Sequence, residues 1–277
     1  MNYLLDVRDR QRISIALSKG AAMMNARKID LTNPTTWEFS GFSQNGEDGI
    51  LDVLRQQLVS CNRYFIEIGS ADGIENNSAW LVMAQKYNGI MIEGNSLLVE
   101  RANRTVASGS IGAECRNMFV TRENVHGLKA MAFHHDPDIF SLDIDGNDYY
   151  IAQAILDCGF RPKIIVVEYN SVFGHDRSIT VEYRADFVFT KVHPTHLYYG
   201  VSISAWRIFF KRYGYRFVTV DQNGVNAFFV DPACFDSTFL SGIKGIEFAE
   251  NQYQYKKFRV PSEEQFTRIA DQKFVTV

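Results

Sequence analysis

The sequence predicts an α/β protein whose mostly parallel, doubly wound sheet is closed by an antiparallel hairpin. Short apolar runs alternate with amphipathic helical segments between residues 63 and 170, as in successive strand–helix units. The continuous run "IIVV" at 164–167 is typical of a strand that is covered on both faces. Near the end of the pattern, an Asn-Gly pair separates two strand-like runs, "RFVTV" and "VNAFFV", which predicts the hairpin.

Length and composition are those of a soluble globular protein. The 277 residues suffice for one large α/β domain, and 46% of them are hydrophobic and 22% charged. A net charge of −3 shows no basic field, so we expect no nucleic-acid partner. Since no apolar run approaches the roughly 20 residues that cross a bilayer, we expect no membrane span. The four cysteines form no CxxC pair, which indicates a reducing, cytoplasmic setting.

The elements follow in order along the chain. A charged amphipathic helix is expected at about 7–27 and another after Ser43, with Pro34 breaking the segment between them. Four strands are then expected at 63–69, 89–95, 137–145 and 162–170. Helices are expected at 75–87, 96–107, 148–159 and 202–215.

This pattern divides the chain into an N-terminal helical extension at 1–41, a main domain at 42–234 and a C-terminal tail at 235–277. The first helix is predicted to dock on the surface or to form a homodimer contact. In a doubly wound sheet, ligands gather beyond the carboxyl ends of the strands. Residues at those ends are therefore the candidates for function.

The segment "FIEIGSADGIENNS" follows the first strand with a glycine loop. Glu67 ends the strand, and Gly69 and Gly73 flank Ser70 in a turn whose backbone can approach a ligand closely. The alternative is a tight turn without a ligand, and the spacing does not match a GxGxxG fingerprint. Glu93 ends the next strand, where a carboxylate can accept hydrogen bonds from ribose hydroxyls. Together these features indicate a cofactor that contains a nucleoside.

The octet "SLDIDGND" at 141–148 places three aspartates around one glycine, and carboxylates this close need a cation or a proton between them. Asp143, Asp145 and Asn147 match the first ligand positions of a helix–loop–helix calcium site. However, Asp148 occupies the required glycine position and Ala154 the required glutamate position. The calcium loop is therefore excluded.

Two interpretations of the octet stay open. In a phosphatase of the haloacid-dehalogenase type, Asp143 would be the nucleophile and Asp145 the acid/base, and Lys163 is available as the lysine that such enzymes need. In a metal site, Asp143 would meet Glu168 and Asn170, which end the following strand, and these oxygen ligands suit Mg²⁺ or Mn²⁺. Asp145 could join the site, or, like Asp148, cap the helix that follows.

Several motifs in this order resemble those of FkbM-type S-adenosylmethionine-dependent methyltransferases. They are "FSQNGEDGIL", "FIEIGSADGIENNS", "MIEGN", "FSLDIDGNDYYI", "VVEYN" and "YYGVSISAW" with the hairpin after it, and they cover about residues 42 to 230. The resemblance implies a Rossmann-like class I methyltransferase fold. In this fold, a mainly parallel seven-stranded sheet with a C-terminal antiparallel hairpin carries helices on both faces.

The resemblance also implies site residues. The cofactor S-adenosylmethionine would be held by residues of the loops before and after the first strand and by the acid that ends the second: Gln44, Glu67, Gly69, Ser70, Gly73, Asn77 and Glu93. Related metal-dependent enzymes hold Mg²⁺ at the ends of the fourth and fifth strands, which maps onto Asp143 and onto Glu168 or Asn170. Ala71 stands where the family loop has its middle glycine.

The expected reaction is O-methylation of a small polar acceptor, such as a sugar, a phosphate-bearing metabolite or a natural-product hydroxyl, assisted by the metal. Asp145 and His175 are the candidate bases, ahead of His134 and His135. The loop at 171–200 is predicted to meet the acceptor or to act as a lid, through polar side chains at Arg177, Arg184, His193, Tyr198 and Tyr199. Two rival functions are the phosphatase and a catalytically inactive protein that binds the cofactor and a partner.

Overall fold

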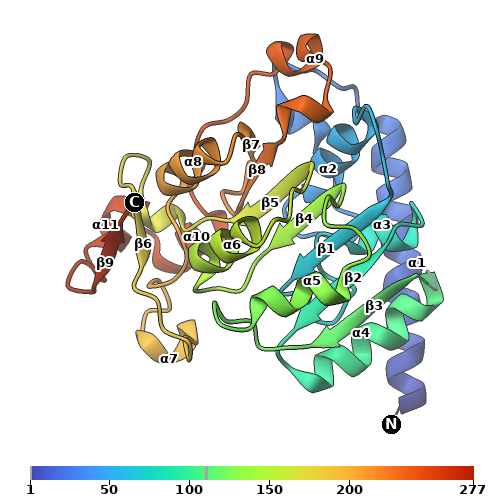
Figure 1. The fold of residues 1–277 in the computed structure, drawn as a ribbon, viewed down its shortest axis with the longest axis horizontal. Helices are drawn as coiled ribbons and strands as arrows, with labels where there is room; N and C mark the ends of the chain where they lie inside the picture. Colours follow the sequence, from blue (N-terminus) through green and yellow to red (C-terminus); the bar gives the residue numbers. More distant parts are fainter. Residues whose placement is uncertain (1, 110–111) are drawn as a thin grey trace.

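The structure, a computed structural model, describes residues 2–109 and 112–277. A seven-stranded sheet in the order β3-β2-β1-β4-β5-β8-β7 forms its centre (Figure 1). Strand β8 is antiparallel to both of its neighbours, and the other adjacent pairs are parallel. The strands are β1 Tyr64–Ile68, β2 Asn88–Glu93, β3 Ala113–Asn117, β4 Ile139–Leu142, β5 Ile164–Glu168, β7 Arg216–Val220 and β8 Asn226–Val230. The predicted sheet with its C-terminal hairpin is confirmed.

Helices cover both faces of this sheet, as expected. Successive side chains of a strand point to opposite faces, so Phe65 and Ile66 belong to different hydrophobic cores. One core is closed by α5 Leu128–Met131, α6 Asp148–Asp157 and α8 Ile203–Arg212. The other is closed by α2 Glu47–Gln56, α3 Ala79–Met83 and α4 Ser96–Gly109.

Strand β3 and helix α3 differ from the sequence-based expectation. Strand β3 was not predicted, because "AECRN" is an edge strand with charged side chains and no apolar run. The helix expected at 75–87 is shorter in the structure, where α3 begins at Ala79. Before it, the Asn76 side chain accepts hydrogen bonds from the N–H groups of Ser78 and Ala79, and Glu67 accepts one from Asn77. These bonds hold the chain in turns where the sequence pattern favoured a helix.

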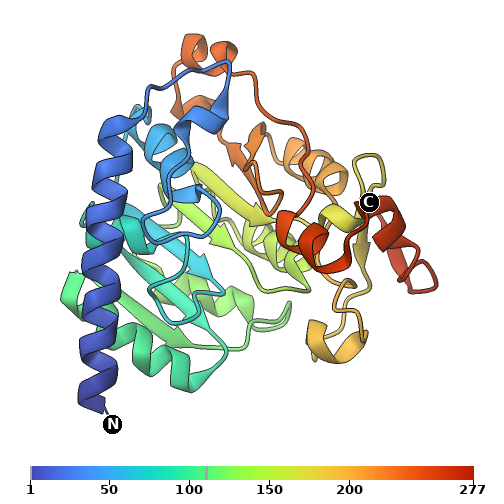
Figure 2. The ribbon, with the colours of Figure 1, turned by 180° about the vertical axis from the view of Figure 1, so that it is seen from behind.

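The N-terminal helix α1 Asn2–Ala26 runs along the side of the molecule away from the C-terminus (Figure 2). It packs against Trp80 of α3, and a Cβ on Gly20 would lie 2.5 Å from the Trp80 ring. A glycine therefore permits the close approach. At its end, Arg27 donates to the carbonyls of Trp37 and Gly49 and forms an ion pair with buried Asp52. Since these contacts lie within one chain, they leave the predicted homodimer untested.

The loop at 171–200 and the C-terminal tail pack together into a further small core, separate from the two cores on the faces of the sheet. Strand β6 Ile179–Val181 pairs with β9 Phe274–Thr276 in a two-stranded antiparallel sheet. The helices of this region and of the tail are α7 Phe189–Val192, α9 Ser237–Gly242, α10 Gln252–Phe258 and α11 Ser262–Phe266. Short 3-10 turns occur at Pro34–Trp37, Val125–Gly127, Ser171–Phe173 and Pro232–Cys234. None of the helices in the described ranges is both long and apolar enough to span a bilayer.

Candidate active site

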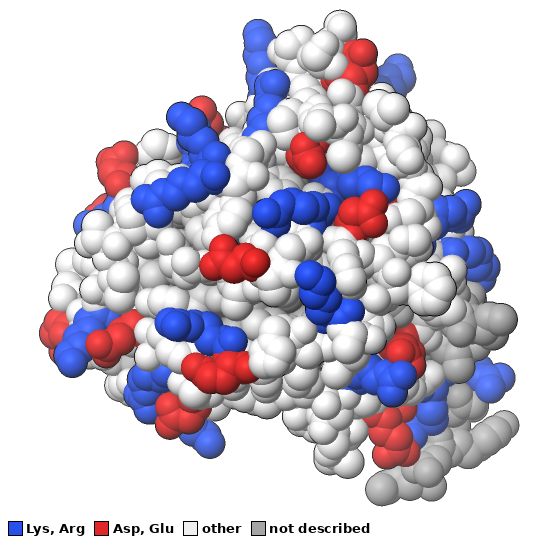
Figure 3. Space-filling view, in the orientation of Figure 1, with Lys and Arg blue, Asp and Glu red and all other residues white. Residues whose placement is uncertain are grey.

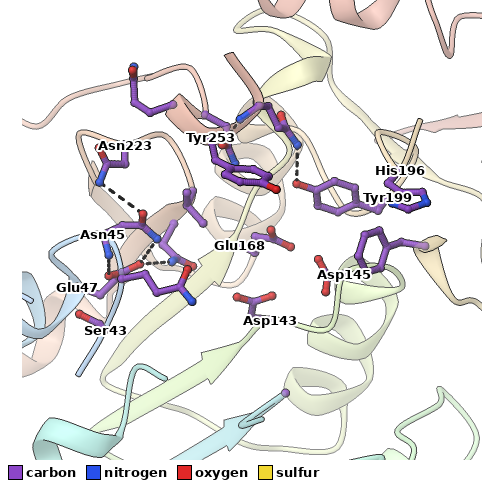
Figure 4. Close-up of a pocket in the computed structure, with 18 of the residues that line it drawn as sticks. Ser43, Asn45, Glu47, Asp143, Asp145, Glu168, His196, Tyr199, Asn223 and Tyr253 are labelled. Atoms are coloured by element: carbon purple, nitrogen blue, oxygen red, sulfur yellow. Dashed lines mark hydrogen bonds between the residues drawn. The ribbon is translucent and has the colours of Figure 1, made fainter. Parts of the chain in front are cut away.

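Three carboxylates converge where β4 and β5 end. Asp143 follows β4 directly, Asp145 comes two residues later, and Glu168 is the last residue of β5. One oxygen of each lies within 4.8 Å of the others, and Figure 4 shows the three groups facing one space. We call these residues the acidic centre. Parallel strands bring their carboxyl ends to the same edge of a sheet, which explains how residues far apart in sequence meet here.

The backbone of the octet is shaped to present these acids. Asp145 has a φ of 53°, a left-handed conformation that is uncommon for a residue with a side chain. The Asp148 carboxylate accepts hydrogen bonds from the N–H groups of Ile144 and Gly146. Asp148 was predicted to cap the helix, but Asn147 holds the N-cap position and Asp148 begins α6. Asp148 therefore fixes the loop that carries Asp145.

The acidic centre is electrostatically uncompensated by the described part of the chain. Burial, followed by the charges of Asp145 and Asp148, raises the pKa of Asp143 well above its usual range. Burial and the neighbouring aspartates raise the pKa of Glu168 in the same way. Burial and Asp148 raise the pKa of Asp145 to about 6. Among the described residues no ion pair with Lys, Arg or His reaches these acids, so a proton or a cation must stabilise them.

The residues of the acidic centre fit a divalent cation. Three carboxylate oxygens are hard ligands of the kind that Mg²⁺ and Mn²⁺ prefer. The buried Oε2 of Glu168 has no hydrogen-bond partner among the residues that the structure describes, as expected for an atom that a ligand satisfies. Asn170, also predicted as a ligand, forms hydrogen bonds to the backbone. Its amide group donates to the carbonyls of Leu197 and Tyr199, and its oxygen accepts from the N–H of Val172.

The glycine loop lies directly against the acidic centre. Gly69 has a φ of 92°, and a Cβ there would lie 1.7 Å from the carbonyl oxygen of Asp143. Only glycine allows this approach. Glu67 is buried, which raises its pKa to about 7, and it accepts hydrogen bonds from Asn77 and Ser78. Glu67 therefore fixes the end of the glycine loop through these hydrogen bonds.

The remaining loop residues have structural partners. Ser70 is buried with its hydroxyl 3.6 Å from the Cys115 sulfur. Gly73 has a φ of 71°, and a Cβ there would lie 2.9 Å from that of Ala102 in α4. The side chain of Asn77 donates to the Ser141 hydroxyl and so ties the loop to β4.

A cavity of about 730 Å³ opens beside the glycine loop, and we call it the glycine-loop cavity. Glu93 lines it and accepts hydrogen bonds from the N–H groups of Ala71 and Asn95, which leaves further lone pairs free. Apolar side chains form much of the remaining lining, namely Ile68, Ile92, Met118, Phe119, Val120, Ile144 and Phe187. A carboxylate beside apolar walls suits a ribose joined to a flat base.

A second cavity of about 640 Å³, the acidic cavity, lies over the acidic centre. Figure 4 shows Asn45, Glu47 and Asn223 on one side of it, Tyr199 and His196 on the other, and Tyr253 between them. The two cavities share five lining residues: Gln44, Gly69, Glu75, Asp143 and Asp145. Whatever binds in one therefore lies next to whatever binds in the other.

The motif "FSQNGEDGIL" builds the wall that carries Gln44. The Asp48 carboxylate accepts from the N–H groups of Gly41, Phe42 and Ser43 and so bends this segment back on α2. The Gln44 side chain then donates to Glu75 over 3.0 Å. Gln44 was predicted from the sequence as a candidate site residue and Glu75 was not, but both line the two cavities.

The tail was also missed as part of the site. It lines the acidic cavity with Asn251, Gln252, Tyr253, Gln254, Lys256, Lys257 and Phe258. No local pattern in the tail indicates a role in binding, because its contacts in the site are long-range: Gln254, for example, meets Tyr199, which lies 55 positions earlier in the chain.

Other predicted residues lie outside the cavities. His175 is exposed on the surface, beside Asp176 and the Phe248 ring, and Arg177 pairs with Glu263. His134 and His135 precede β4 and so lie toward its amino end, away from the acidic centre. The remaining loop candidates are engaged elsewhere: Arg184 with Asp186, His193 with Thr195, and the Tyr198 hydroxyl with the Lys273 carbonyl.

The lysine that a phosphatase would need is at the wrong end of the sheet. Lys163 precedes β5 and donates to Asp138, with 2.8 Å between Nζ and Oδ1. Asp138 precedes β4, so this ion pair lies at the amino ends of the two strands whose carboxyl ends carry Asp143 and Glu168. Lys163 therefore cannot serve a phosphatase site at Asp143.

Comparisons with known proteins concern the fold. No family model and no curated protein matches the sequence. Among solved structures, an O-methyltransferase from Bacillus cereus in complex with S-adenosylhomocysteine (SAH) is similar at 14% identity and a TM-score of 0.43, over 79% of this chain and 89% of that one. The O-methyltransferase TomG from Streptomyces achromogenes, in complex with S-adenosylmethionine, is similar at 17% identity and a TM-score of 0.43, over 77% and 87%. Identities and scores this low assign neither activity nor substrate.

Proposed function

We propose that this protein is an S-adenosylmethionine-dependent methyltransferase that methylates a hydroxyl group of a small polar acceptor with the help of a divalent cation. The observation that carries the proposal is the junction of the two cavities at Gly69, Asp143 and Asp145. A methyl donor in the glycine-loop cavity would lie beside an acceptor in the acidic cavity. Such alignment is the main requirement of an in-line methyl transfer.

The chain's own residues would bind and orient the cofactor. Glu93 would accept hydrogen bonds from its ribose hydroxyls, and the apolar walls near Phe119 and Ile144 would hold its base. The backbone at Gly69 would approach its methionine end, with Gln44 and Asn77 nearby in the acidic cavity. The transfer forms a bond from the acceptor oxygen to the methyl carbon, breaks the sulfur–methyl bond and releases SAH.

The acidic centre would hold the cation and prepare the acceptor. Asp143, Asp145 and Glu168 would supply the ligands, and a cation held there would lower the pKa of an acceptor hydroxyl. The hydroxyl must also lose its proton. Asp145 faces the acidic cavity (Figure 4), whereas His175 lies outside it, so Asp145 is the better placed of the two predicted bases.

Ligand-induced stabilisation tests this function. We expect SAH to raise the melting temperature by several degrees, because a ligand at about 100 times its Kd stabilises by about 2.7 kcal/mol. Mn²⁺ or Mg²⁺ should add a separate increase that EDTA removes. If SAH leaves the melting temperature unchanged and the protein hydrolyses phosphate monoesters, the rival phosphatase function is correct. Cofactor binding without cation-dependent release of SAH over an acceptor panel would favour the inactive partner protein.

A further inference from the structure

The tail helix α10 closes the acidic cavity from a fixed position. The backbone N–H of Asn251, which precedes the helix, donates to the Ser171 hydroxyl over 2.9 Å, and that of Gln252 donates to the Asn223 carbonyl over 3.0 Å. The Asn251 side chain in turn accepts from the N–H of Gln254. Both the segment after β5 and the hairpin turn therefore hold α10 in place over the acidic centre.

Three residues that line this cavity each have a buried side-chain oxygen without a hydrogen-bond partner within the described residues. These oxygens are Oε2 of Glu168, Oδ1 of Asn226 and Oε1 of Gln254, on side chains that are at most 8% exposed. The other amide atom of Gln254 donates to the Tyr199 hydroxyl over 3.1 Å, so the side chain is held with one group unsatisfied. Buried acceptors are stabilised by donors. A ligand that satisfies them must bring hydrogen-bond donors, such as hydroxyl groups, or a cation.

The last turn of α10 adds positive charge to the same cavity. Lys256 and Lys257 line it, and both are exposed. Neither forms an ion pair with a carboxylate of the described chain, although the Lys257 ammonium lies 5.1 Å from the Phe258 ring centre. On the face of the molecule that Figure 3 shows, acidic and basic side chains are interspersed. The acidic cavity instead has acids on its floor and unpaired lysines at its rim.

We propose that the acidic cavity selects acceptors that carry an anionic oxyacid group, phosphate or carboxylate, in addition to hydroxyl groups. The hydroxyl groups would face the acidic centre and Gln254, and the anionic group would meet Lys256 and Lys257, since ammonium groups bind oxyanions by charge-assisted hydrogen bonds. This proposal rests on the proposed function for its reaction and goes beyond it by naming the acceptor class and the tail residues that recognise it.

Sugars that differ in a single group test this selection. We would titrate glucose, glucose 6-phosphate and glucuronate by calorimetry into the protein with SAH and Mg²⁺. At least one charged sugar should bind about tenfold more tightly than glucose, which corresponds to a difference of about 1.4 kcal/mol in binding free energy. The charged sugar that gains affinity identifies the oxyacid as phosphate or carboxylate. In K256Q/K257Q the advantage should fall below about threefold, since the loss of both ammonium groups removes the charge-assisted bonds.

The matched control is K19Q/K28Q, which removes two exposed lysines that line neither cavity. It changes the net charge by the same amount and should keep the tenfold advantage. The proposal is overturned if glucose binds as tightly as both charged sugars, or if K256Q/K257Q keeps the advantage. It is also overturned if neither charged sugar binds at a concentration of about 10 mM, which is far above the Kd of a useful substrate. A separate titration with SAH tests the proposed function, so its failure is distinguishable from that of the anion site.

Discussion

Arg12 of α1 donates a hydrogen bond to Asp72 of the glycine loop, with 2.9 Å between Nη1 and Oδ2. Arg101 of α4 lies 3.3 Å from the same carboxylate and also pairs with Asp9 of α1. A second Arg12 nitrogen lies 3.3 Å from Glu75, which lines both cavities. The N-terminal helix is thus connected through a short ionic network to the loop that would hold the cofactor.

Replacement of Arg12 by Gln should therefore weaken cofactor binding. The side chain is 37% exposed, so the network contributes modestly, and we expect the SAH Kd to rise about threefold to tenfold. Isothermal titration measures this directly. Arg8→Gln, an exposed change on the same helix, is the control and should leave the Kd unchanged. An equal effect of both substitutions would mean that helix charge acts in general and that the contact with Asp72 is unimportant.

Asp143 and Glu93 should separate cation binding from cofactor binding. Asp143→Ala removes one ligand of the acidic centre, so Mn²⁺ affinity measured by electron paramagnetic resonance should fall about 100-fold, while the SAH Kd stays within about twofold. Glu93→Ala should do the reverse and raise the SAH Kd at least about tenfold, because hydrogen bonds to a charged group contribute about 1.5–3 kcal/mol. Unchanged Mn²⁺ affinity in Asp143→Ala would refute the metal site.

The sequence predicts the sheet and the acids at its edge because both follow from local periodicity. Strand ends are recognisable, and parallel strands necessarily bring Asp143 and Glu168 together. Asn170 shows what this reasoning leaves out. Its position after β5 suggests a metal ligand, but its side-chain amide donates hydrogen bonds to the backbone carbonyls of Leu197 and Tyr199. Whether a polar side chain serves a ligand or its own fold depends on contacts that the strand pattern does not contain.

The contribution of the tail could not be predicted for a related reason. Gln254 meets Tyr199 across 55 positions of sequence, and β9 pairs with β6 across nearly 100. Neither segment shows a periodic pattern of apolar residues that would indicate which part of the chain it packs against. Edge strands and irregular loops are placed by tertiary contacts, and the same limit explains why β3 was missed.

The stability of the protein should depend on pH through the acidic centre. Folding raises the pKa of Asp145 to about 6 and raises the pKa values of Asp143 and Glu168 well above their usual range, each through burial first. Carboxyl groups with a raised folded pKa stabilise most below their unfolded pKa, near 4, and lose this contribution as pH rises through the folded value. In the presence of EDTA the melting temperature should therefore fall as the pH rises from about 4 to 7, and Asp143→Asn should make this fall smaller. Saturating Mn²⁺ at pH 7 should restore stability, and a wild type and variant with identical pH profiles would contradict this origin.

Gly69→Ala tests whether the glycine loop must touch the acidic centre. Its Cβ would lie 1.7 Å from the Asp143 carbonyl oxygen, in addition to the strain of a φ of 92°. Gly214→Ala is the matched control, because Gly214 has a φ of 87° but no atom within 4 Å of the added carbon. Urea unfolding should show a loss of about 1 kcal/mol for Gly214→Ala, from backbone strain alone, and of about 3 kcal/mol or more for Gly69→Ala. Only Gly69→Ala should also weaken Mn²⁺ and SAH binding, since it separates the two loops. Equal losses of stability in the two variants, with ligand binding intact, would mean that the close approach of Gly69 to Asp143 is not required.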